Sequence, residues 1–149
     1  MKKTWGPPTW LFLHCFAEHI NKDFFIQNRG HCLNIIRQIC NQIPCNYCKQ
    51  NALNFIKYNR LENIKTKEDM KNYLFKFHNH ANVASNSKNV AIDVLKKYKH
   101  INFFNSALFF YNRFNTRSVT TKLFMNQFTR KNTLISIMNW IKHNKRGFE

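Results

Sequence analysis

The sequence predicts an all-α protein. Glycine and proline are scarce, with three of each in 149 residues, so the chain has few of the turn residues that a β-sandwich needs. Apolar residues recur instead with helical spacing, for example at Phe25, Cys32, Ile35, Ile36 and Ile39. Hydrophobic residues make up 44% of the chain, including 15 phenylalanines, which is enough for the core of one domain with an appendage.

The first helix is expected to follow the turn sequence at residues 5–8, with Thr9 as its N-cap, and to run to Ile20. Trp10 and His14 are four residues apart and therefore share one face of this helix. Both side chains are also ordinary core residues, so the pair alone does not define a site.

A second helix is expected over residues 24–42. It contains Cys32 and Cys40, which are eight residues apart, so their Cα atoms would lie about 12 Å from one another on one helix. This distance is too long for a disulfide bond. We therefore expect these cysteines to be buried thiols that pack as small apolar side chains.

The segment Pro44-Cys45-Asn46-Tyr47-Cys48 begins the third expected helix. Proline is well tolerated in a first turn, and the free N–H groups there favour the thiolate of the first cysteine. Two cysteines at this spacing are able to form a disulfide and to exchange two electrons with other thiols. The same pattern also occurs as half of a zinc site or as a structural staple.

Thr66 and Asp69 have the spacing of a capping box, which predicts a fourth helix over residues 67–83. One face of its last turns carries three hydrogen-bonding side chains, at His78, Asn79 and Asn82. An asparagine-rich helix end is usually a cap. Further helices are expected over residues 90–99, 103–111, 123–128 and 134–141.

Residues 1–100 are expected to form the functional domain and residues 101–149 a helical extension. The apolar stripes of the extension have to be buried against the domain's own flank, a second subunit or a partner protein. We expect the extension to enlarge a homodimer interface, which needs a self-complementary apolar patch.

The formal net charge of +17 would attract nucleic acid, acidic proteins or an anionic cofactor. A solvated surface rich in lysine and asparagine explains the charge equally well. The sequence has no apolar run of membrane-spanning length, and no apolar segment follows the basic residues at its start. We therefore expect neither a membrane span nor a signal peptide, and a cytoplasmic location.

Several cofactor sites fit the cysteines poorly. The flanking segments are helical, which argues against a thioredoxin-like βαβ unit. Zinc needs four ligands, and a second pair of suitably spaced cysteines is missing. Cys40, Cys45 and Cys48 have the spacing of a plant-type iron–sulfur site, but no fourth cysteine follows. The three glycines lie too far apart for a phosphate-binding loop.

Three short motifs follow one another along the chain: Trp5-Gly6 with Trp10-x3-His14, then Pro44-Cys45-x2-Cys48, then His78-Asn79-x2-Asn82. In this order they resemble the Erv/ALR family of FAD-linked sulfhydryl oxidases over about residues 4–99, and most closely its compact members encoded by large DNA viruses of eukaryotes. The resemblance implies a four- or five-helix bundle that cradles FAD beside the CxxC. It also implies oxidation of client dithiols to disulfides, with reduction of molecular oxygen to hydrogen peroxide.

The resemblance further implies roles for individual residues. Cys45 would exchange with the substrate, and Cys48 would lie against the flavin. Tyr98 matches an aromatic residue near the adenine, and Lys88 matches a family lysine after a shift of one residue. The residues expected to bind FAD are Trp5, Gly6, Trp10, His14, His78, Asn79, Asn82, Lys88 and Tyr98.

The chain departs from the family at several points, and the aromatic pair expected soon after the first-helix histidine is replaced near His19-Ile20. The structural disulfide around the His-Asn motif has no cysteines here, and no second CxxC or CxC pair exists to relay electrons. The expected partners are therefore client dithiol proteins, or a thioredoxin-like shuttle, that meet Cys45 directly. A viral member would act in the cytoplasm of the infected cell and in the virion.

The competing hypothesis is a basic, non-enzymatic module that binds nucleic acid and carries a structural CxxC. Lysine and arginine would contact phosphates, and phenylalanine and tyrosine would stack on bases. This hypothesis leaves the ordered tryptophan, cysteine and histidine motifs unexplained.

Overall fold

The computed structural model describes residues 2–115 and 121–149, and the side chains of residues 4–115 and 126–149. The described residues form helices and no strand, which confirms the all-α prediction. The elements are α1 (Lys2–His19), α2 (Lys22–Gln27), α3 (Arg29–Asn41), α4 (Asn46–Tyr58), η1 (Leu61–Asn63), α5 (Lys67–Ala84), η2 (Ile92–His100), α6 (Phe103–Phe114), α7 (Thr121–His143) and η3 (Lys145–Phe148).

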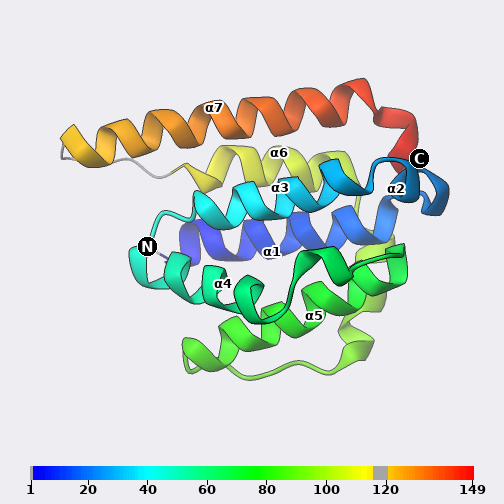
Figure 1. Ribbon diagram of the computed structural model, residues 1–149, viewed down its shortest axis with the longest axis horizontal. Helices are drawn as coiled ribbons and strands as arrows, with labels where there is room; N and C mark the ends of the chain where they lie inside the picture. The colour runs from blue at the N-terminus through cyan, green and yellow to red at the C-terminus, as the bar shows by residue number, and fades with distance from the viewer. Residues whose placement is uncertain (1, 116–120) are drawn as a thin grey trace.

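Helix α1 lies in the middle of the bundle (Figure 1). It packs against α5 and η2 on one side and against α6 on another, while α4 packs against both α3 and α5. Aromatic rings fill the contact between α1 and α6, where Phe12 stacks on Phe110 with ring centroids 4.6 Å apart. The walls on either side of α1 are therefore formed by segments far apart in the sequence.

Two helix starts are set by their cap residues. Thr66 accepts a hydrogen bond from the Asp69 N–H, and the Asp69 carboxylate accepts one from the Thr66 N–H, which confirms the predicted capping box of α5. Cys45 is the N-cap of α4, with Pro44 just outside the helix. The CxxC therefore begins a helix, as predicted.

Four predictions about the helices are wrong. The first helix begins at Lys2 and includes Pro7 and Pro8, so Thr9 is not an N-cap. The Thr9 hydroxyl instead donates to the Trp5 carbonyl at 2.6 Å. The predicted second helix is broken at Asn28, whose side chain donates to the Phe24 carbonyl. The segment predicted as an α-helix over residues 90–99 is a 3-10 helix from Ile92 to His100.

The fourth wrong prediction concerns the last two predicted helices, which form one continuous helix, α7. The predicted stripe positions at Leu123 and Phe124 lie outside the described side chains. None of the helices in the described parts of the chain combines the length and the apolar character that crossing a membrane requires.

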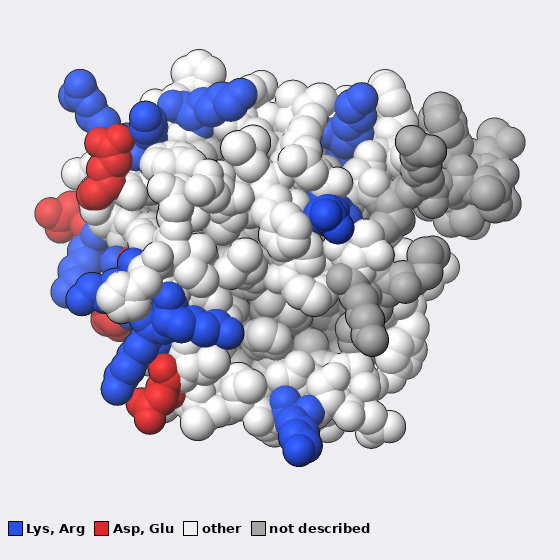
Figure 2. Space-filling model, turned by 180° about the vertical axis from the view of Figure 1, so that it is seen from behind, with Lys and Arg blue, Asp and Glu red and all other residues white. Residues whose placement is uncertain are grey.

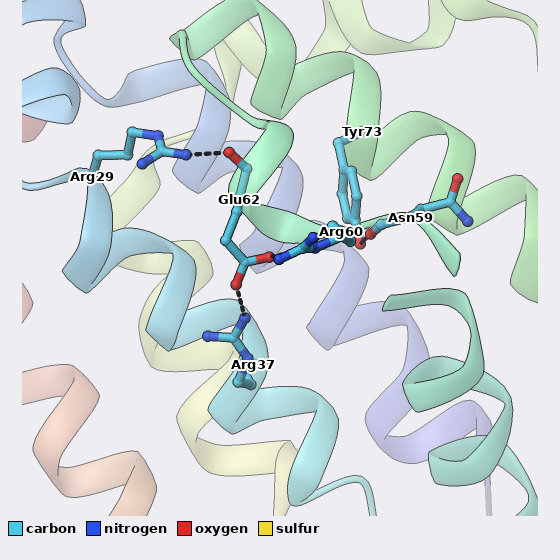
Figure 3. Close-up of polar contacts among 6 residues, drawn as sticks. All are labelled: Arg29, Arg37, Asn59, Arg60, Glu62 and Tyr73. Carbon is cyan, nitrogen blue, oxygen red and sulfur yellow. Dashed lines mark hydrogen bonds and ion pairs between the residues drawn. The ribbon is translucent and has the colours of Figure 1, made fainter. Parts of the chain in front are cut away.

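Polar contacts fix the connection between α4 and α5 onto α3 (Figure 3). Arg29 donates to the backbone carbonyl of Glu62, and Arg37 forms an ion pair with the Glu62 carboxylate at 2.8 Å. The Tyr73 hydroxyl donates to the Asn59 carbonyl at 2.7 Å, which ties the end of α4 to α5. These contacts hold α4 and α5 together on one side of α1.

The C-terminal extension shares its core with the first hundred residues. On α6 the buried positions include Phe103, Phe110 and Phe114, and all three rings lie within aromatic contact distance of α1 side chains. Phe148 stacks on Phe103 with centroids 4.4 Å apart, which closes the end of the chain onto the same core. Much of the extension's apolar surface is thus buried within this chain.

Candidate functional site

The two cysteines of the CxxC form a half-buried pair at the start of α4. Cys45 has extended backbone angles, with φ −149° and ψ 118°, and its Sγ accepts a hydrogen bond from the Cys48 N–H at 3.2 Å. A sulfur at the N-cap lies where the helix offers free N–H groups and the positive end of its dipole. The Cys45 sulfur therefore takes the place that a side-chain oxygen usually has at a helix N-cap.

Cys48 borders a cavity of about 290 Å³ between α1, α4 and α5. Its walls are largely apolar and include the rings of Trp10 and Phe77, which meet edge to face with centroids 5.1 Å apart. Cys40 also lines this cavity, whereas Cys45 does not. The second cysteine of the motif therefore faces an apolar cavity, and the first one lies outside it.

A second cavity, of about 630 Å³, adjoins the first one beyond Trp10. Residues Gly6, Trp10, Ala81 and Ser85 line both cavities, so together they form an elongated groove between α1 and α5. The far end is more polar than the end beside the dithiol, and its walls include His78, Asn82, Ser87, Lys97 and Tyr98.

Four rings stack in two layers at the second cavity: Trp10, His78 and Tyr98 line it, whereas His14 is buried and lines neither cavity. Trp10 lies parallel to His78 with centroids 4.2 Å apart, and His14 stacks on Tyr98 at 4.7 Å. The two layers are joined by a hydrogen bond of 2.9 Å between His14 Nε2 and His78 Nδ1. The sequence motifs around residues 10–14 and 78 are thereby brought together.

Both histidines of this cluster are neutral at neutral pH. Burial, with smaller effects from His78 and Lys97, lowers the pKa of His14 to about 3. Burial and the charge of Lys97 lower the pKa of His78 to about 4. One imidazole therefore donates and the other accepts in the bond between them.

The remaining predicted site residues are divided between the groove and the scaffold. The Asn79 amide donates to the Val90 carbonyl and accepts from the Val90 N–H, each at 3.0 Å, so it fastens the loop after α5. Lys88 is exposed and lines neither of the two cavities. Trp5 is buried at the edge of the first cavity, where its ring meets Phe114 edge to face.

The other three cysteines are buried, as predicted for Cys32 and Cys40. Burial raises the pKa of Cys15 to about 11, and the pKa of Cys32 and of Cys40 to about 12. Thiols with such pKa values react slowly at neutral pH. Thiol exchange is therefore expected at Cys45 and Cys48.

Sequence reasoning missed Lys97, the cationic side chain at the polar end of the groove. Its position beside Tyr98 was the available signal, but the run of neighbouring lysines gave no reason to choose it. Among the described side chains, those of residues 4–115 and 126–149, no three metal-ligating groups converge on a common point.

The geometry defines a helical dithiol protein whose redox pair borders an elongated groove with an apolar and a polar end. The Erv1 / Alr family model matches residues 7–101, and the chain belongs to this family. FAD-linked sulfhydryl oxidases make up the family, and its members typically bind FAD. The match ends after η2, so α6 and α7 lie outside it. No curated protein and no solved structure matches the chain.

Proposed function

We propose that this chain is an FAD-dependent thiol oxidase that forms disulfides in client proteins. The observation that carries the proposal is the arrangement of the CxxC: Cys45 caps α4, and Cys48 lines the groove. The family of the chain supports the cofactor and the class of reaction.

The groove has the chemical character that FAD requires. Trp10 and Phe77 at the apolar end suit a flat ring system, and Cys48 lies beside them. Asn82, Lys97 and Tyr98 at the far end suit a phosphate, a ribose and a stacked adenine. Bound FAD would take two electrons from a dithiol and pass them to molecular oxygen, which yields hydrogen peroxide.

The cysteines divide the thiol chemistry between them. A client thiolate attacks Sγ of Cys45 in the Cys45–Cys48 disulfide, which releases Cys48 as the thiolate. The second client thiol then displaces Cys45, so the client leaves as a disulfide and the enzyme is left as a dithiol. Because Cys45 lies outside the cavity that Cys48 lines, it is the better placed of the two to meet a client.

We further propose that clients, or a thioredoxin-like shuttle, react with Cys45 without an internal relay. The proposal is supported by the burial of the other three cysteines. A homodimer, and a viral origin with activity in the cytoplasm of the infected cell or in the virion, are proposals that rest on the resemblance to compact viral family members.

The nucleic-acid hypothesis has less support. In Figure 2 the lysine and arginine side chains gather mainly at one end of the molecule, and aspartate and glutamate lie among them. Ion pairs such as Lys71–Glu18 at 2.7 Å and Lys96–Asp93 at 3.3 Å use part of the positive charge. The residues drawn in colour on this face do not form the continuous basic track that a nucleic-acid backbone follows.

Oxygen uptake with a small dithiol as substrate tests the proposal. Cys45→Ser and Cys48→Ser should each abolish uptake, because each removes one half of the exchanging pair. Asn46→Ser, at the first residue of the same helix, is the matched control and should retain it. Oxygen uptake at the unsubstituted rate in either cysteine variant would contradict the assigned roles.

A further inference from the structure

The C-terminal extension, residues 101–149, contacts the segment just before the CxxC through one buried side chain. Arg130, on α7, is 8% exposed. Its Nε donates to the backbone carbonyl of Gln42 at 2.6 Å, and its Nη1 donates to the Asn115 side-chain oxygen at 3.2 Å. A residue outside the family match thus contacts the chain three positions before Cys45.

A contribution to folding stability alone does not account for the burial of Arg130. Both of its described acceptors are neutral, and no ion pair joins it to a carboxylate within the described residues. Taking a charge out of water without a counter-charge is costly, and apolar residues of similar volume are often as stabilising at such positions. The contact with Gln42 is therefore the feature to explain.

Gln42 is the C-cap residue of α3, and its backbone N–H donates to the Ile39 carbonyl. A carbonyl at the C-terminal end of a helix carries partial negative charge and is a favourable acceptor for a guanidinium. Arg130 therefore fixes the point at which the chain leaves α3.

Between this fixed carbonyl and Cys45 lie two residues, Ile43 and Pro44. Proline has a fixed φ, and it restricts the residue before it to extended conformations. The link is therefore short and stiff, so the position of Gln42 determines where Cys45 begins α4.

We propose that Arg130 is a positioning residue for the redox pair: through the Gln42 carbonyl it holds the loop in which Cys45 caps α4 and accepts the Cys48 N–H. The redox role of the pair rests on the proposed function. The extension is then part of the redox site and does more than cover α1.

Loss of this anchor should weaken the contact between Cys45 Sγ and the Cys48 N–H. Because the Cys45 sulfur then loses the N–H that it accepts, its alkylation at pH 7 should slow by about threefold to tenfold, the range that one helix cap contributes. The reduced pair is stabilised less by the same contact. Its equilibrium with glutathione should therefore shift towards the Cys45–Cys48 disulfide by a similar factor.

The experiment uses the purified full chain, reduced beforehand, with Arg130→Met as the test variant. Arg113→Met is the matched control, because Arg113 is an exposed arginine of the same extension whose guanidinium lies over the Phe109 ring. Iodoacetamide labelling of the Cys45 peptide is followed by mass spectrometry. The dithiol–disulfide ratio is measured in glutathione buffers. Neither readout needs flavin or oxygen, so they separate this inference from the proposed oxidase activity.

Slower labelling and a shifted equilibrium in Arg130→Met, with Arg113→Met unchanged, are the expected results. Unchanged values in a folded Arg130→Met, or an equal change in both variants, would overturn the inference. If circular dichroism shows that Arg130→Met does not fold, Arg130→Lys and Asn115→Ala decide the question. Each should change labelling in the same direction by a smaller factor, and unchanged labelling in both would overturn the inference.

Discussion

Acidification should destabilise this protein through His14 and His78, which are hydrogen-bonded to one another. The loss of stability should begin at a pH well above the range in which carboxylates become protonated. Burial lowers the pKa of these imidazoles to about 3 and about 4, from an unfolded value of 6.5. At pH values between the folded pKa values and 6.5, the unfolded chain binds up to two more protons than the folded chain. Stability is therefore fully present above pH 6.5 and is lost as the pH falls towards the folded pKa values.

The magnitude follows from the two shifts. Between pH 7 and pH 5 both imidazoles become protonated in the unfolded chain but stay neutral in the folded chain. This difference should lower the free energy of unfolding by about 3 kcal/mol, a value that allows for the partial exposure of His78. Glu62 and Asp69 add little between pH 7 and pH 5, because their ordinary pKa values of 4.5 and 3.8 lie below this window and are lowered further in the folded chain.

Urea unfolding at pH 7, 6 and 5, followed by tryptophan fluorescence and circular dichroism, measures this dependence. The double variant His14→Gln, His78→Gln should lose most of the slope, even though it is less stable overall. His143→Gln is the control, because His143 is exposed at the end of α7. An unfolding free energy that does not change with pH in the unsubstituted chain, or an unaltered slope in the double variant, would refute the reasoning.

Three other predictions concern the core. Replacing the three buried cysteines with alanine should leave oxygen uptake largely intact and lower the unfolding free energy by about 3 kcal/mol, measured by urea denaturation. Phe110→Ala should cost about 3–5 kcal/mol, whereas the exposed Leu108→Ala should change stability by less than about 0.5 kcal/mol. A chain ending after His100 should lose its cooperative thermal unfolding, because the α6 rings leave α1. A stable, fully flavin-loaded truncated chain would contradict that role of the extension.

Local signals predicted the features that depend on a few neighbouring residues. The capping box at Thr66 and Asp69 and the helix start at Cys45 are examples, because their contacts span three residues. The break at Asn28 was missed, because the apolar stripe continues through it and the stop comes from a side-chain bond to Phe24. The 3-10 geometry of η2 was missed as well, since the spacing of its apolar residues also fits an α-helix.

The site was predictable as a set of residues but not as a shape. His14 and His78 were singled out by motif, yet their contact depends on the packing of α1 against α5. The two hydrogen bonds between the Asn79 amide and the Val90 backbone depend on the course of the loop after α5. Arg130 could not be predicted, because no spacing relates a residue of the extension to the Gln42 carbonyl.

The visible absorption spectrum of the purified chain tests the central claim most directly. An FAD-dependent oxidase should be yellow, with the flavin bands, and denaturation should release about one FAD for each chain. Trp10→Ala should lower the flavin content, because it removes the ring shared by both cavities. A folded, colourless protein that takes up no flavin when incubated with FAD would contradict the claim.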